Sequence, residues 1–166
     1  MGRILLFLAS ATVLLSTNSV VAQDSGALAV MVPGGGTYSR PITTDSQQAQ
    51  AFFDQVLRMA CGFYFPESIA SYQEPARLDP DRPMPHFGIA HAAGPNPNSR
   101  YAGMPDDPQG AGLAAIRRAM EPANNGTQRE RDMNNALFVL YNQAAIHDRV
   151  ERDFAFILNH DVSAAK

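Results

Sequence analysis

The pattern that most constrains this chain is a series of short amphipathic segments separated by proline and glycine. From residue 46 onward, apolar residues recur every three or four positions, which is the period of one helix face. No segment of the sequence has the strict apolar–polar alternation of a half-buried β-strand. The sequence therefore predicts an all-α fold of short helices, each of which needs a neighbour to cover its apolar face.

Capping residues and prolines predict the limits of six helices. The expected helices cover 46–62, 66–80, 83–93, a fourth from Asp107-Pro108 to Asn124-Asn125-Gly126, 127–146, and a sixth from Asp148 onward. Thr127 and Glu130 have the spacing of a capping box. Pro75 lies inside the second helix and is expected to kink or end it, since an interior proline costs roughly 3 kcal/mol. The sixth helix has one apolar stripe, formed by Val150, Phe154, Ile157 and Leu158.

The N-terminus has the three-part layout of a cleavable secretory signal peptide. Arg3 supplies the positive charge, an apolar run covers 4–15, and Val20 and Ala22 fit the small-residue cleavage rule. The apolar run is too short to span a membrane. We expect cleavage after Ala22, export to the periplasm or the medium, and no stable membrane insertion afterwards.

Four parts are expected along the chain. They are a signal peptide (1–22), a flexible leader (23–40), a helical domain (41–160) and a tail (161–166). The leader is assigned from its glycine-rich, irregular composition. The residues after Ala22 are numerous enough for one domain with its own core.

Charge and cysteine content exclude several classes of function. Cleavage removes Arg3 from the 13 basic residues, which leaves 12 against 16 acidic ones and a net charge of −4. Nucleic-acid binding is not expected, because it requires a basic surface. Cys61 is the only cysteine, so an intramolecular disulfide and a CxxC redox centre are excluded. Its apolar neighbours predict a buried thiol.

Residues 41–98 resemble the opening repeat of exported bacterial tetratricopeptide-repeat (TPR) proteins. The matching residues are Pro41-Ile42-Thr43-Thr44, Ala49-Gln50, Phe53-Asp54-Gln55, Leu57, Phe63, Glu67, Ile69-Ala70-Ser71-Tyr72, Ala76-Arg77-Leu78-Asp79-Pro80, Met84, Phe87-Gly88-Ile89-Ala90, Gly94-Pro95-Asn96 and Asn98. A weaker agreement continues to about residue 155. The resemblance implies a short solenoid of antiparallel helix pairs whose concave side binds other polypeptides, without catalysis or a cofactor.

The repeat register implies that the first helix of each pair lines the protein-binding groove. The implied groove residues are Gln50, Phe53, Asp54, Leu57, Met84, Phe87 and His91. Core packing is an equally open interpretation for Phe53, Leu57 and Phe87.

Several departures indicate a short or degenerate member of that family. Val56 replaces the family's usual glycine, Pro75 its alanine and Phe87 its tryptophan. Tyr64-Phe65 replaces a polar turn, and 99–103 resembles an insertion. The apolar last helix suggests that the protein forms a homodimer through this exposed end.

Two other hypotheses remain open. An exported enzyme or metal-binding protein would combine His86 or His91 with the loop that carries Asn96 and Asn98. The two histidines are five residues apart and so point to different helix faces. No GxSxG or HExxH motif is present, and we therefore expect neither a metal nor catalysis. The other hypothesis is a truncated, non-functional remnant of a longer repeat protein.

Overall fold

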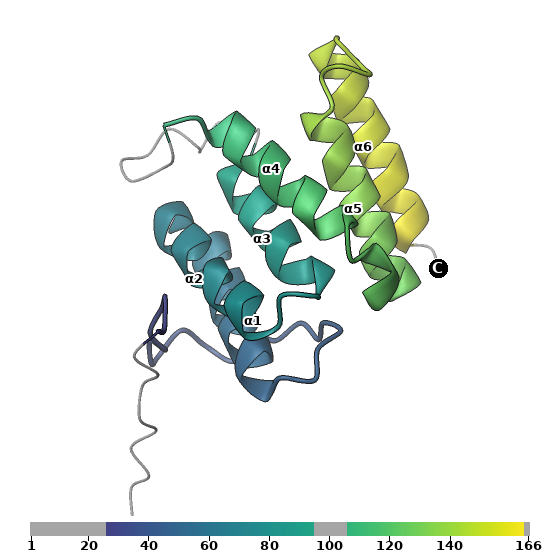
Figure 1. Cartoon of the computed structure of the whole chain (residues 1–166). Coiled ribbons are helices and arrows are strands. Elements are labelled where there is room, and N and C mark those ends of the chain that lie inside the picture. The colour runs from purple at the N-terminus through teal and green to yellow at the C-terminus, as the bar shows by residue number, and fades with distance from the viewer. Residues whose placement is uncertain (1–25, 95–105, 165–166) are drawn as a thin grey trace, which may run out of the picture.

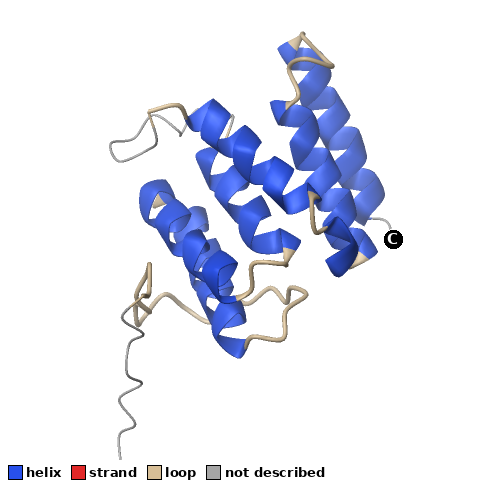
Figure 2. Cartoon of the chain, in the orientation of Figure 1, coloured by secondary structure: helices blue, strands red, loops and turns tan. Residues whose placement is uncertain are grey.

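The computed structural model describes residues 26–94 and 106–164, with side chains up to residue 158. Within this part, the regular structure is helical and no strand is present (Figure 2), which confirms the all-α prediction. The helices are α1 (Gln47–Cys61), α2 (Phe65–Leu78), α3 (Pro83–Ala93), α4 (Pro108–Met120), the short 3-10 helix η1 (Ala123–Asn125), α5 (Gln128–Tyr141) and α6 (Arg149–Ala164).

Consecutive helices pair into three hairpins. α1 packs on α2, α3 on α4 and α5 on α6 (Figure 1). Contacts of α2 with α3 and of α4 with α5 join one hairpin to the next in chain order. Additional contacts between α3 and α5 bring the first helices of two neighbouring hairpins together. This arrangement agrees with the helix pairs expected from the sequence.

Two clusters of buried apolar side chains form the core, and α3 contributes to both. The first cluster contains Phe53, Val56, Phe65, Tyr72, Met84, Ala92 and Met133. The second contains Ala90, Ala115, Ile116, Ala119, Leu137 and Tyr141. Phe87 and Ile89 on α3 pack against both clusters. The core therefore runs continuously from the first hairpin to α5.

Two glycines allow helices to approach a buried tyrosine closely. A Cβ atom on Gly88 would lie 2.1 Å from the Tyr72 ring, and one on Gly112 would lie 2.1 Å from the Tyr141 hydroxyl oxygen. The Tyr141 hydroxyl donates a hydrogen bond to the Ala90 carbonyl, which ties α5 to α3. Burial raises the pKa of both tyrosines, so both hydroxyls stay protonated.

Pro75 does not end α2, which continues through this buried residue to Leu78. Three other local predictions are wrong. α4 ends at Met120, and residues 123–125, where its end was expected, form the separate 3-10 helix η1. α5 ends at Tyr141 rather than near residue 146. The backbone N–H of Asn142 caps the helix there by donating to the carbonyls of the last turn. Cys61 is exposed, because the last residue of α1 projects beyond the core that Val56 and Ala60 reach.

Candidate functional site

Residues 26–46, which include the described part of the leader, have an irregular backbone. Side chains on the helices contact this backbone at several positions along its length. The backbone N–H of Leu28 donates to the Glu74 carboxylate on α2 at 2.7 Å. The Gln55 amide on α1 accepts from the Val32 N–H at 2.6 Å and donates to the Val30 carbonyl at 2.9 Å. These contacts attach the leader to the first hairpin, and its flexibility stays a prediction.

Asp54 and Gln50 on α1 bind the next part of the chain, residues 39–43, which we call the bound segment. The Asp54 carboxylate accepts from the Ser39 hydroxyl at 2.7 Å and from the Arg40 N–H at 2.9 Å. The Gln50 amide donates to the Arg40 carbonyl and accepts from the Ile42 N–H, each at 2.9 Å. One face of α1 thus pairs with the main chain of the bound segment.

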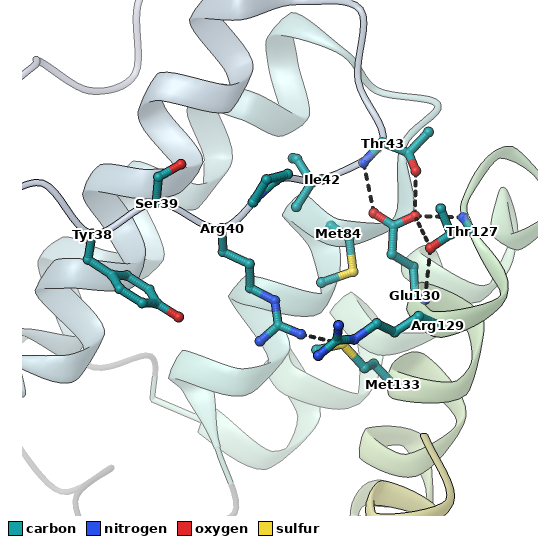
Figure 3. Close-up of a pocket in the computed structure, with 11 residues that line it drawn as sticks. Tyr38, Ser39, Arg40, Ile42, Thr43, Met84, Thr127, Arg129, Glu130 and Met133 are labelled. Atoms are coloured by element: carbon teal, nitrogen blue, oxygen red, sulfur yellow. Dashed lines mark hydrogen bonds between the residues drawn. The ribbon is translucent and has the colours of Figure 1, made fainter. Parts of the chain in front are cut away.

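Glu130 on α5 holds the other end of the bound segment (Figure 3). Its carboxylate accepts from the Thr43 N–H at 2.8 Å and from the Thr43 hydroxyl at 2.6 Å. It also accepts from the N–H of Thr127 at 2.7 Å and completes the predicted capping box. Glu130 therefore both starts α5 and connects α5 to a segment 87 residues earlier in the chain.

The surroundings of Glu130 favour its charged form. Burial alone would raise its pKa, but hydrogen bonds from the hydroxyl and backbone of Thr43 and of Thr127 lower the pKa below the ordinary value. A glutamate in the unfolded chain has a pKa of about 4.3. The stabilisation from the lowered pKa is therefore complete above that pH and is lost as the pH falls through the lower folded-state pKa.

We expect the stability of the protein to fall in acid partly through Glu130. The difference in unfolding free energy between the wild type and Glu130→Gln should be largest at pH 7 and should shrink below about pH 4. Urea denaturation at pH 7 and pH 3 measures this difference. Glu151→Gln, at an exposed position on α6, controls for the loss of one negative charge. A difference that is the same at both pH values would contradict the assignment.

A cavity of about 510 Å³ lies between the bound segment and helices α3 and α5 (Figure 3). Its lining residues are Tyr38, Ser39, Arg40, Pro41, Ile42, Thr43, Met84, Thr127, Arg129, Glu130 and Met133. The Arg40 guanidinium donates to the Met133 thioether sulfur at 3.0 Å, and thioethers are weak acceptors. This volume lies in the range of ligand-binding cavities in proteins.

The predicted groove residues divide between this face and the core. Gln50 and Asp54 contact the bound segment, and Met84 lines the cavity beside it. Phe53 belongs to the core, where its ring meets Tyr72 edge-on with 5.6 Å between centroids.

The remaining groove candidates lie further from the bound segment. Leu57 is half-buried and packs against the first core cluster, and Phe87 packs against both clusters. The ring of His91 stacks on the ring of Phe87, with 6.0 Å between the ring centroids. Gln55, Glu74 and Glu130 were missed as contacts to the leader and the bound segment; the signal that could have indicated them is a polar residue inside a buried helix face.

The histidines do not form a joint site within the described residues. His86 lines a cavity of about 300 Å³ with Asp81, Arg118 and Glu121 between α3 and α4. Burial lowers its pKa, a hydrogen bond to the Pro80 carbonyl opposes this, Arg118 lowers the pKa further and Glu121 raises it. The described residues contain no group of three or more histidine, cysteine, aspartate or glutamate side chains that could hold a metal ion. Asn96 and Asn98 lie outside the described residues.

Known proteins provide no assignment for this site. Models of protein families, curated proteins and solved structures contain no match to the chain. Among the described helices, none has the length and apolar character needed to cross a lipid bilayer.

Proposed function

We propose that this protein is an exported TPR-like module that binds an extended polypeptide and performs no catalysis. The binding face consists of Gln50 and Asp54 on α1, Met84 on α3, and Glu130 and Met133 on α5. The observation that carries the proposal is that this face holds a five-residue segment of the chain itself, with main-chain hydrogen bonds to Arg40, Ile42 and Thr43.

The chemistry of the binding face suits a peptide backbone. A buried carboxylate or amide is costly unless it is hydrogen-bonded. Asp54 is 9 % exposed and Glu130 is 7 % exposed, and the bound segment supplies backbone N–H and hydroxyl donors to both. Gln50 pairs with one carbonyl and one N–H, as a neighbouring strand would. The packed core argues against a remnant that no longer folds.

Affinity capture with matched variants tests the proposal. The exported chain is used as bait in its own extracytoplasmic fraction, alongside Arg129→Glu at the cavity rim and Arg117→Glu at an exposed position on α4. We expect a polypeptide that wild type and Arg117→Glu retain and that Arg129→Glu loses. Equal retention by all three baits, or no reproducible polypeptide, would count against the binding face.

We further propose that a second copy of the chain covers the apolar stripe on α6. The four stripe residues Val150, Phe154, Ile157 and Leu158 are each more than half exposed. Contiguous exposed apolar groups of this kind mark interaction sites on soluble proteins. A two-fold contact would pair the stripe with itself and bury both copies at once.

A further inference from the structure

The binding face contacts hydroxyl groups as well as the main chain. The Asp54 carboxylate accepts hydrogen bonds from the Ser39 hydroxyl and from the N–H of the next residue. The Glu130 carboxylate accepts hydrogen bonds from both the hydroxyl and the N–H of Thr43. From the bound segment, each buried carboxylate therefore accepts one backbone donor and one side-chain donor, so a hydroxyl residue fits each end of the bound segment. A residue without a hydroxyl would remove one hydrogen bond to a buried carboxylate.

The middle of the bound segment is recognised by other means. Gln50 pairs with the main chain of residues 40 and 42 on either side of Pro41, which has no N–H to satisfy. The Ile42 side chain packs against the first core cluster. The Arg40 guanidinium extends across the cavity to Met133 on α5 (Figure 3). The bound segment therefore presents, in order, a hydroxyl residue, a basic residue, a proline, an apolar residue and a second hydroxyl residue.

We propose that residues 39–43 act as the chain's own ligand for the binding face, and that the partner polypeptide carries an extended segment of the same chemistry. This inference rests on the proposed function and names the partner by the groups that the face accepts. A partner segment would replace the bound segment and make the same hydrogen bonds to Asp54, Gln50 and Glu130.

Tethering makes the bound segment a strong competitor. A ligand joined to its site by a short linker acts at an effective concentration of about millimolar or more. The apparent affinity for an external peptide is then the intrinsic affinity multiplied by the fraction of molecules whose binding face is open. Weakening the bound segment without altering the helices should therefore increase the affinity for the external peptide.

A competition experiment on the full exported chain tests this. The probe is a fluorescent peptide with the sequence of residues 37–45, and its binding is followed by anisotropy. The double variant Ser39→Ala/Thr43→Val loses both hydroxyl contacts of the bound segment. We expect this variant to bind the probe at least about tenfold more tightly than wild type does. A probe with the same two substitutions should bind the variant at least about tenfold more weakly than the native probe.

Thr44→Val is the matched control. The Thr44 hydroxyl donates to Asp79 at the end of α2, outside the binding face, at 2.6 Å. The control therefore also loses a threonine hydroxyl bond to a carboxylate but should bind the probe as wild type does. Equal binding of the native and substituted probes would overturn the inference, as would a folded double variant that binds no more tightly than the control.

If the double variant does not fold, as judged by circular dichroism, amide hydrogen exchange of the wild type provides a second measurement. With the native peptide at millimolar concentration, the Arg40 and Thr43 amides of the wild type should exchange faster, because the displaced segment loses its hydrogen-bond acceptors. Unchanged exchange would overturn the inference. A partner that the Arg129→Glu bait loses, without displacement of the bound segment by the peptide, supports the proposed function and contradicts the inference about residues 39–43. Displacement by the peptide without a captured partner supports the inference about residues 39–43 and counts against the proposed function.

Discussion

Gly88→Ala is expected to cost about 3 kcal/mol of unfolding free energy, near the upper end of the usual effect of overpacking a core. The added methyl group would lie 2.1 to 2.4 Å from three atoms of the Tyr72 ring. Tyr72 is 1 % exposed and its ring contacts Phe53, so the ring has no free space to move into. α3 must move away from α2 instead, which opens the first core cluster. Urea denaturation followed by circular dichroism measures the loss.

Gly35→Ala is the matched control for this substitution. A Cβ atom at Gly35 meets only the flexible Arg58 side chain, at 3.4 Å. This variant should stay within about 0.5 kcal/mol of wild type. Gly112→Ala, against Tyr141, should behave like Gly88→Ala. If Gly88→Ala unfolded at the same urea concentration as wild type, the close approach of α3 to Tyr72 would be wrong.

Charging the α6 stripe is expected to dissociate the proposed dimer. Phe154 is 63 % exposed and Leu158 is 67 % exposed, one turn apart on the same helix face. In a dimer these side chains would be buried against their symmetry mates, where an aspartate would lose its hydration without gaining a partner. Phe154→Asp or Leu158→Asp should raise the dimer dissociation constant by about 100-fold, or about 2.7 kcal/mol. Sedimentation equilibrium over a range of concentrations measures this constant.

The control for the dimer lies on the same helix. Arg149 forms an ion pair with Asp153 at 3.8 Å, and both side chains are exposed. Arg149→Gln changes the charge of α6 without altering the apolar stripe, so it should leave the dissociation constant unchanged. A wild-type chain that remains monomeric at high micromolar concentration would contradict the dimer. An Arg149→Gln effect as large as that of Phe154→Asp would place the contact outside the stripe.

Local signals predicted most of the helices. Ser46 and Gly62 bracket α1, and Thr127 with Glu130 starts α5, as their side chains and spacing indicated. The limits of α3 were also predicted, because prolines favour the first turn of a helix and glycine its end. Each of these signals acts within a few residues, so it survives in any tertiary setting.

The proposed binding face depends on contacts between residues that lie far apart in the sequence. Thr43 and Glu130 meet across 87 residues, and nothing in the local pattern of either one indicates the other. Glu130 was predicted only as a capping residue, although its carboxylate serves two segments at once. The exposure of Cys61 escaped prediction for a related reason: apolar neighbours indicate burial only inside a helix, and Cys61 ends one.

The position of α3 has a consequence for how the molecule unfolds. Arrays of hairpins can lose terminal units one at a time when each unit contacts only its neighbours. Here Phe87 and Ile89 pack against both apolar clusters, so removing the first hairpin also exposes side chains that cover the second cluster. The first two hairpins and α5 should therefore melt cooperatively, as one thermodynamic unit, and partial loss of repeats should be rare in this region of the chain.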